Sequence, residues 1–302
     1  KIGAHVIRGA LMYLMYQLNP GVCCPITMTF AATPALEAGT RGGRKIPFLE
    51  EILHKLRLPG YSGADIPLQD KPAVTVGMSM TEKQGGSDVR ANTTHATPLR
   101  PEDSGSGDEF ELVGHKWFTS APMSDGFLTL AHTQEGVSCF LVPRWLPMAH
   151  GTRNEGFQLQ RLKDKMGDKS NASSEVEYRQ ARGWMIGAPG RGGRTIVDMV
   201  VHTRLDCVIG SAALMRQCAQ LAVHHCAARR AFGKPLLDQP LMRSVLADLS
   251  IESEAAMTLW VRLAAALDGA AVGNSAERDF IRLATAVSKY WICKRAPAVA
   301  YE

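Results

Sequence analysis

The order of hydrophobic patterns along the chain is the feature that most limits its fold. Apolar residues recur at helical spacing in residues 1–72 and again in residues 196–302, whereas residues 73–195 show short alternating runs separated by Gly, Pro, Asn and Asp. Strands that alternate with helices would indicate a parallel, doubly wound sheet, and this order is different. The sequence therefore predicts an α+β protein with an N-terminal helical domain, a middle antiparallel β domain and a C-terminal helical bundle.

The helical blocks show where some of the helices end. A first helix stops at Asn19-Pro20-Gly21, and a second, over residues 46–58, stops at Pro59-Gly60, because such pairs interrupt helical structure. In the C-terminal block, two apolar stripes step by 4, 3 and 4 residues: Ala256, Trp260, Leu263 and Leu267, and then Phe280, Ala284, Val287 and Trp291. We expect both stripes, including their aromatic residues, to lie in the core of the bundle.

Composition excludes some classes of protein. The formal net charge of +5 permits an anionic ligand such as a nucleotide, coenzyme A or nucleic acid, but it does not select among them. The seven cysteines include no C-x-x-C pair, so we expect reduced thiols in a cytoplasmic protein. There is no apolar run of about 20 residues, so we expect no membrane span. The sequence starts without Met and in mid-pattern, and we expect the N-terminal domain to be incomplete.

The run from Gly77 to Val89 carries the first chemical signal. Two glycines, Gly85 and Gly86, allow the backbone to approach a bulky ligand and expose its N–H groups. The hydroxyls of Thr81 and Ser87 can donate hydrogen bonds to a phosphate or to a ring carbonyl. A surface turn has the same composition, so this run alone leaves both interpretations open.

A second signal lies in the run Gly114-His115-Lys116-Trp117-Phe118-Thr119-Ser120. A strand that ends in Trp followed by hydroxyl residues can present an indole for stacking and an OH for hydrogen bonding. A half-buried strand tryptophan with no ligand explains the same pattern.

Two other runs favour structural interpretations. In His224-His225-Cys226 the adjacent histidines would project to different sides of a helix, so we expect no metal site there. The run Gly190-Arg191-Gly192-Gly193-Arg194 is typical of a linker turn, although its arginines could also contact phosphates.

Taken together, four motifs in order resemble the acyl-CoA dehydrogenase family. They are T-E-x-x-G-G-S-D at residues 81–88, K-W-F-T-S at 116–120, the strand at 165–176 and R-x-x-F-G-K at 229–234. The segments M-T-E-K-Q-G-G-S-D and C-K-R-A-P are similar to those of the AidB-type, alkylation-response branch of that family. The resemblance covers nearly the whole chain and implies the same order of helical, β and helical domains.

The resemblance implies an FAD site and assigns residues to it. Thr81 would lie near the pyrimidine edge of the flavin and Ser87 near the pyrophosphate, Trp117 would stack on the ring, and Thr119 or Ser120 would bond near N5. Arg229, Phe232 and Gln239 would reach the FAD of a neighbouring subunit, which implies a homo-oligomer, typically a tetramer. The full cofactor set is Met80, Thr81, Gly86, Ser87, Trp117, Phe118, Thr119, Ser120, Arg229, Phe232 and Gln239, and Ser87 and Arg204 would contact substrate.

The catalytic base that the family requires is missing from its two usual positions. One position precedes an Arg on the first helix of the C-terminal domain, and here that pair is Thr203-Arg204. Threonine cannot take the α-proton of a thioester. The other is an aromatic-Glu-Gly run, which does not occur before Glu302. We expect the bundle to be truncated and the base to lie beyond Glu302, or else the protein lacks one.

Three functions remain open from the sequence. The first is an FAD enzyme that oxidises the α,β-bond of an acyl-CoA with hydride transfer to flavin N5. The second, implied by the AidB-type resemblance, is a flavoprotein that binds DNA and limits alkylation damage with little dehydrogenase activity. The third is a structural homologue without flavin, which the presence of Thr81, Ser87 and Trp117 argues against.

Overall fold

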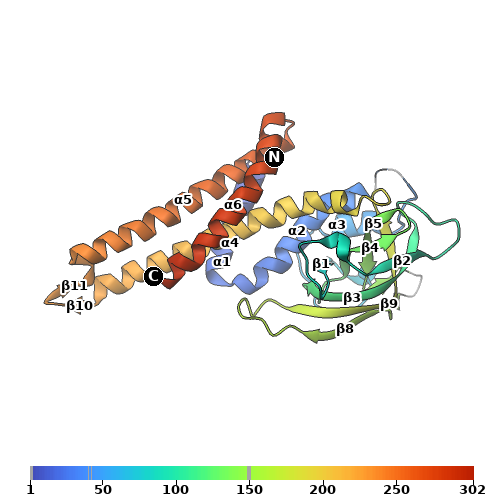
Figure 1. Ribbon diagram of the computed structural model, residues 1–302, viewed down its shortest axis with the longest axis horizontal. Helices are drawn as coiled ribbons and strands as arrows, with labels where there is room; N and C mark the ends of the chain where they lie inside the picture. The colour runs from blue at the N-terminus through green and yellow to red at the C-terminus, as the bar shows by residue number, and fades with distance from the viewer. Residues whose placement is uncertain (1–2, 40, 42, 148–150) are drawn as a thin grey trace. The chain divides into compact units, whose positions relative to one another are not determined.

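The computed structural model describes residues 3–39, 41, 43–147 and 151–302. These residues form two compact units, a β unit of Cys24–Val200 and a helical unit made of Lys1–Cys23 with Val201–Glu302. The residues that the sequence groups as an N-terminal helical domain therefore divide between two units (Figure 1). The α+β class and the order of helical, β and helical segments are as predicted.

The β unit contains one large sheet with two helices of its own. Its strands are β1 (Val76–Thr81), β2 (His95–Pro98), β3 (Glu109–Ser120), β4 (Gly126–Thr133), β5 (Gly136–Pro143), β8 (Phe157–Leu162) and β9 (Ser173–Ile186). The order is β1-β3-β2-β4-β5-β9-β8, and additional pairings of β1 with β4 and of β3 with β9 close part of the sheet on itself. β4 runs parallel to β1 and β2, and the other pairs are antiparallel. A separate short ribbon pairs β6 (Trp145–Leu146) with β7 (Thr152–Arg153), and the helices are α2 (Cys23–Ala38) and α3 (Leu49–Lys55).

Alternation along the strands gives the sheet two apolar faces. One face, with Leu128 and Leu130, packs against α2, α3 and the first turns of α4 (Gly192–Ala228). The other face, with Phe127, Phe140 and Tyr178, lies inside the closed part of the sheet. Successive residues of β4 point to opposite faces, as strand geometry requires.

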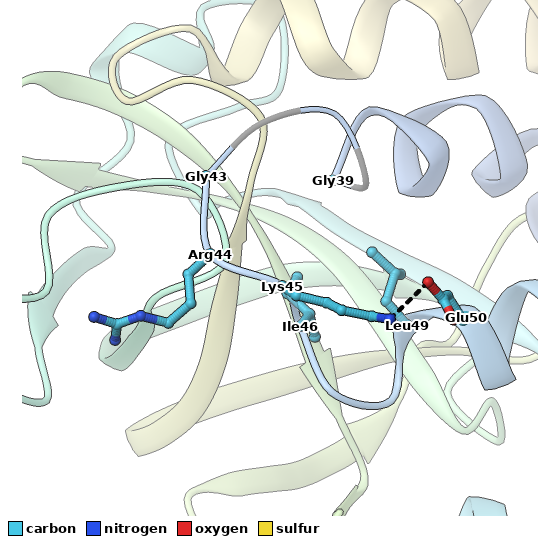
Figure 2. A pocket seen from close by; sticks show the side chains of 7 residues that line it. All are labelled: Gly39, Gly43, Arg44, Lys45, Ile46, Leu49 and Glu50. Atoms are coloured by element: carbon cyan, nitrogen blue, oxygen red, sulfur yellow. Dashed lines mark ion pairs between the residues drawn. The ribbon is translucent and has the colours of Figure 1, made fainter.

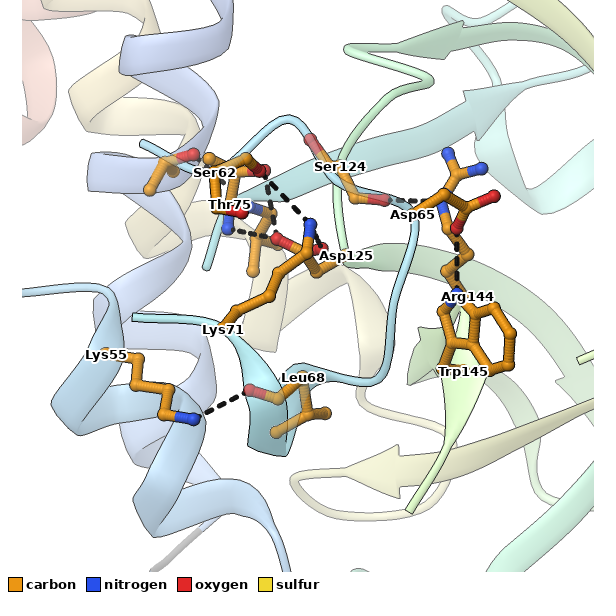
Figure 3. Close-up of polar contacts among 12 residues, drawn as sticks. Lys55, Ser62, Asp65, Leu68, Lys71, Thr75, Ser124, Asp125, Arg144 and Trp145 are labelled. Carbon is orange, nitrogen blue, oxygen red and sulfur yellow. Dashed lines mark hydrogen bonds and ion pairs between the residues drawn. The ribbon is translucent and has the colours of Figure 1, made fainter. Parts of the chain in front are cut away.

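A polar network holds the connecting segment 59–75 against the β unit before β1 begins (Figure 3). The Lys71 ammonium donates to Asp125 Oδ1 at 2.5 Å, and Asp125 Oδ2 accepts from the Thr75 N–H at 2.8 Å. The indole of Trp145 donates to Asp65 at 2.8 Å. Arg144 is buried and donates to the carbonyl oxygens of Ser124 and Pro122. These bonds fix the turn that follows Ser120 at the end of β3.

The helical unit contains α1 (Ala4–Leu18), most of α4, α5 (Pro240–Ala271) and α6 (Ser275–Tyr301), with a short hairpin of β10 (Arg230–Ala231) and β11 (Lys234–Pro235) between α4 and α5. Pro240 occupies the first turn of α5, where a missing N–H costs nothing. Asn274 caps α6 by accepting the Glu277 N–H at 3.2 Å. The sequence therefore favours the starts of α5 and α6 at these residues.

Carboxylates tie α1 to its neighbours in the helical unit. Gly3 offers no side-chain cap, and Asp268 of α5 instead accepts the N–H groups of His5 and Val6 at 2.9 and 3.3 Å. Arg8 forms a two-bond ion pair with Asp206 of α4, at 2.8 and 2.6 Å. The acceptors lie on other helices, so α1 is held by tertiary rather than local bonds. Within the described residues, no helix is both long enough and apolar enough to span a membrane.

One of the two predicted core stripes is correct and the other is wrong. Trp260, Leu263 and Leu267 of α5 are buried. In the stripe on α6, by contrast, Phe280, Val287 and Trp291 are exposed, and Ala284 alone packs against the core. The buried face of α6 lies one residue further along, at Ile281, Thr285, Ser288, Ile292 and Val299. The guanidinium groups of Arg262 and Arg295 lie 4.3 and 5.0 Å from the exposed rings and cover them in place of the core.

Candidate functional site

The two sequence runs with chemical signals meet as paired strands. In the antiparallel pairing of β1 with β3, Met78 faces Ser120, Ser79 faces Thr119 and Thr81 faces Phe118. The chain then returns toward β1, since a Cβ built on Gly86 would lie 2.7 Å from Thr81 Oγ1. The structure thus brings together six predicted cofactor residues: Met80, Thr81, Gly86, Phe118, Thr119 and Ser120.

Irregular pairing marks the same place on both strands. The register of β1 against β3 shifts between Ser79 and Thr81, and that of β3 against β9 shifts between Lys116 and Thr119. Such β-bulges redirect side chains and are frequent beside functional sites. Met80, Trp117 and Phe118 lie in these irregular stretches, so their side chains are not confined to simple alternation.

A buried ion pair fixes the start of the glycine loop. Lys116 Nζ donates to Glu82 Oε1 at 2.9 Å and to the Leu130 carbonyl at 2.8 Å, and both charged side chains are almost wholly buried. Glu82 also accepts the N–H and hydroxyl groups of Thr93 and Thr94. Burial alone would raise the pKa of Glu82, but these hydrogen bonds and the charge of Lys116 hold it far below its usual range. Burial lowers the pKa of Lys116, against the effect of Glu82.

The loop after Glu82 suits an anion such as pyrophosphate. Residues 83–88 are exposed, and Gly85 has φ +129° with open space where a Cβ would stand. Within the described residues, no hydrogen bond joins the Gly86 or Ser87 N–H to another protein group. A Cβ on Gly86 would crowd Thr81, so only glycine leaves this approach open. The free donors, the Ser87 hydroxyl and the bare glycines fit the phosphate part of FAD.

The two hydroxyl residues at the end of β3, Thr119 and Ser120, differ in burial. Thr119 is fully buried, and its Oγ1 shares a 2.6 Å hydrogen bond with Ser79 Oγ. The Thr129 hydroxyl donates to the Ser79 carbonyl at 2.6 Å. Ser120 is half-buried and lies opposite Met78. Of the two residues predicted near flavin N5, Ser120 is therefore the more accessible.

Trp117 is half-buried beside positive charge. Lys163 Nζ lies 3.2 Å from the centroid of the indole, and Lys83 Nζ and Arg161 Cζ each lie 6.0 Å from it. Sequence reasoning missed Lys163, Glu82 and Lys116. Glu82 and Lys116 lie inside the two motifs. Their opposite charges, next to strand residues, were the signal that could have predicted a buried ion pair.

The predicted cofactor residues of the helical unit gather at one hairpin. The Leu236 N–H donates to the Arg229 carbonyl at 2.8 Å, and Gln239 Nε2 donates to the Ala231 carbonyl at 3.0 Å. Phe232 stands at the turn with φ +51° and is 95% exposed. A bulky residue at positive φ is uncommon because the conformation costs backbone energy. Such strained residues are frequent at functional positions. Arg204 lies in α4, roughly 36 Å along the helix axis from the hairpin, and is not part of this group.

A small pocket elsewhere in the β unit is unrelated to these residues. It has a volume of about 160 Å³ and is lined by Gly39, Gly43, Arg44, Lys45, Ile46, Leu49 and Glu50 (Figure 2). Lys45 pairs with Glu50 at 2.9 Å across its rim. Its volume is below the several hundred Å³ typical of a site for a drug-sized ligand, so it is too small for a flavin nucleotide. Among the described residues, no three His, Cys, Asp or Glu side chains are placed to hold a metal ion.

Family models match three successive parts of the chain. They are the acyl-CoA dehydrogenase middle domain at residues 77–181, the acyl-CoA dehydrogenase C-terminal domain at residues 190–302 and the AidB N-terminal domain of adaptive response proteins at residues 1–55. The chain belongs to the acyl-CoA dehydrogenase family. Its β1–β3 site lies in the family's middle domain, and its β10–β11 hairpin lies in the family's C-terminal domain.

Individual relatives agree with this membership. AidB of Escherichia coli K12 is 46% identical over 301 residues, covering 99% of this chain and 53% of its own length. The structure of Caenorhabditis elegans ACDH-11 in complex with C11-CoA has a TM-score of 0.83 at 30% identity, covering 98% of this chain and 49% of that one. A glutaryl-CoA dehydrogenase from Mycobacterium smegmatis in complex with FADH2 shares the fold alone, at 17% identity and TM-score 0.68, over 98% of this chain and 69% of that one. The chain spans about half the length of the first two relatives.

Proposed function

We propose that the protein is an FAD-dependent oxidoreductase that introduces an α,β double bond into an acyl-CoA thioester. The observation that carries this proposal is the meeting of Thr81 with Phe118 at two adjacent β-bulges, beside a loop with free N–H groups. A relative with the same fold is described with FADH2, and ACDH-11 is described with C11-CoA. When bound, FAD would accept the hydride from the β-carbon.

The chain's own residues divide the work of holding FAD. We assign Thr81 and Met80 to the pyrimidine edge, Gly86 and Ser87 to the pyrophosphate, and Trp117 and Phe118 to the faces and edges of the ring. Ser120, with Thr119 behind it, is the hydrogen-bonding group toward N5. The Glu82–Lys116 pair holds β1 and β3 in register, so these donors are fixed before the cofactor arrives.

Fewer residues can be assigned to the substrate and to a second subunit than to FAD. Ser87 and Arg204 are our candidates for contact with acyl-CoA, and Thr203 cannot serve as the catalytic base. We propose that Arg229, Phe232 and Gln239 contact the FAD of a second subunit in a cytoplasmic homo-oligomer, such as a tetramer. The strained, exposed Phe232 supports this, because a free hairpin tip gains nothing from a phenyl ring.

A second function rests on the AidB-type features of the chain. The AidB N-terminal match and the threonine at one usual position of the base favour a flavoprotein that binds duplex DNA and has little dehydrogenase activity. Arg179, Arg191 and Arg194 are exposed and would contact phosphates in that role, whereas Arg182 of the same basic region is paired with Glu109. Both functions require the same flavin site.

Anaerobic titration of the FAD-loaded protein distinguishes the two functions. Bleaching of the flavin by short branched acyl-CoAs supports the dehydrogenase, whereas no bleaching together with salt-sensitive binding to duplex DNA supports the second function. Ser87→Ala and Arg229→Ala should each weaken FAD affinity. Unchanged affinity in both variants, or a protein that cannot be loaded with FAD, would overturn the proposal.

A further inference from the structure

Lys163 occupies an unusual position next to the proposed flavin site. Its ammonium lies 3.2 Å from the centroid of the Trp117 indole and 4.9 Å from the centroid of the Phe118 ring. The side chain is only 8% exposed, although it ends in an ammonium group. An ammonium over an aromatic face is attracted by the electrons of the ring, and the attraction grows as water is excluded.

The β8–β9 hairpin determines where this lysine stands. The Lys163 N–H donates to the Ser173 carbonyl at 2.8 Å, directly after the pairing of Leu162 with Ser174. Lys163 Nζ then donates to Glu175 Oε1 at 2.8 Å. The ammonium is therefore fixed by a backbone bond, a carboxylate and a ring, and its place does not depend on a flexible surface chain.

The charges around Trp117 do not balance. Arg161 donates to the same Glu175 oxygen at 2.8 Å, so two cations share one carboxylate, and these bonds lower the pKa of Glu175. Lys83 adds a third cation 6.0 Å from the indole centroid. Glu177, a second carboxylate on β9, shares a 2.7 Å hydrogen bond with His115. The surroundings of the indole are thus electropositive.

We propose that Lys163 is a positioning residue of the flavin site, which holds the Trp117 indole and, with Arg161, supplies excess positive charge that favours reduced flavin. The inference rests on the proposed function, because it requires FAD beside Trp117. Two-electron reduction leaves negative charge on the flavin ring, and a fixed cation stabilises that form more than the neutral oxidised form. Lys163 acts by positioning the Trp117 indole and by the electrostatic potential of its ammonium. It takes no proton from substrate.

Two variants with opposite expected signs test this role. Lys163→Met keeps much of the side chain and removes the charge, so the midpoint potential of bound FAD should become more negative. Glu175→Gln keeps the lysine and removes the shared counter-charge, so the potential should become less negative. We expect each change to alter the ratio of reduced to oxidised flavin about tenfold, or about 30 mV for a two-electron couple.

Two lysine substitutions serve as controls, one at Lys163 itself and one elsewhere in the β8–β9 hairpin. Lys163→Arg keeps the charge and should retain most of the wild-type potential. Lys169→Met removes an exposed lysine of the same hairpin, which lies 3.9 Å from Asp164, and should leave the potential unchanged. The potentials are measured by reductive titration against a reference dye, with the flavin absorption spectrum recorded at each step. If Lys163→Met does not fold, Glu175→Gln and Lys163→Arg decide the question.

The outcomes separate this inference from the proposed function. FAD bound by every variant at one unchanged potential would overturn the role of Lys163 and leave the flavin site intact. A shift of the same sign in Lys163→Met and Glu175→Gln would also overturn it, because the effect would then follow from disturbed structure. A wild-type protein that binds no FAD would overturn both proposals.

Discussion

The Lys116 ammonium and the Glu82 carboxylate meet 2.9 Å apart in the interior of the β unit, and the two residues belong to the two different motifs of the proposed flavin site. Lys116 precedes Trp117 on β3, and Glu82 follows Thr81 at the end of β1. One buried ion pair therefore sets the position of Trp117 relative to the Thr81 hydroxyl.

Lys116→Met should destabilise the β unit by about 3 kcal/mol, because removing one partner leaves the other charge buried and unpaired. Hydrogen exchange of the β3 amides measures this local free energy of opening. Lys169→Met, which removes an exposed lysine of the same unit, should change it by less than about 0.5 kcal/mol. Equal protection in the two variants would show that the pair does not stabilise the sheet.

Gly86→Ala should weaken FAD binding about tenfold without unfolding the protein. The new Cβ would stand 2.7 Å from Thr81 Oγ1, so the loop or the threonine must move away from its present place. Gly167→Ala is the matched control, because its Cβ would meet nothing within 4 Å. Equilibrium titration with FAD gives both affinities, and equal values would remove Gly86 from the site.

Phe232→Gly should relieve about 1 kcal/mol of strain at the hairpin turn, since φ +51° costs a side chain more than it costs glycine. The same change should weaken FAD binding and reduce assembly, if the ring contacts a second subunit. Thermal unfolding and analytical ultracentrifugation measure the two effects. A variant that keeps full FAD affinity and the same oligomeric state would contradict the proposed contact.

Acid should loosen the helical unit through His202. Burial, with the charges of His5 and Arg8, lowers the pKa of His202 to about 4, below the ordinary value of about 6.5. The folded unit therefore disfavours the proton that the unfolded chain accepts, so stability is full above pH 6.5 and falls as the pH drops toward 4, by about 3 kcal/mol. Urea unfolding followed by helical circular dichroism measures this slope. His202→Phe should flatten it, and an unchanged slope would assign it to other groups.

Local sequence patterns predicted where helices and strands lie better than they predicted which face of a helix is buried. The break predicted at Asn19-Pro20-Gly21 is where α1 ends, and the strands β1 to β9 lie within residues 73–195, where the short alternating runs were expected. On α6, however, the stripe through Phe280 and the stripe through Ile281 both have helical spacing. Spacing cannot choose between adjacent stripes, because the choice depends on which side of the helix α5 covers.

The motifs predicted which residues gather, but not what supports them. Thr81 and Phe118 were expected in one site, and the sheet pairs them. The approach of Lys163 to Trp117 depends on the pairing of β8 with β9 and of β9 with β3, which no local pattern specifies. Non-local contacts of this kind require the topology of the sheet.

Fluorescence titration with FAD, comparing the protein with its Trp117→Phe variant, tests the central claim most directly. If flavin binds between the β1 and β3 motifs, FAD should quench the part of the tryptophan emission that the variant lacks, and the protein should retain its yellow colour after dialysis. FAD that quenches both proteins equally, or that dialyses away from both, would contradict a flavin site at Trp117.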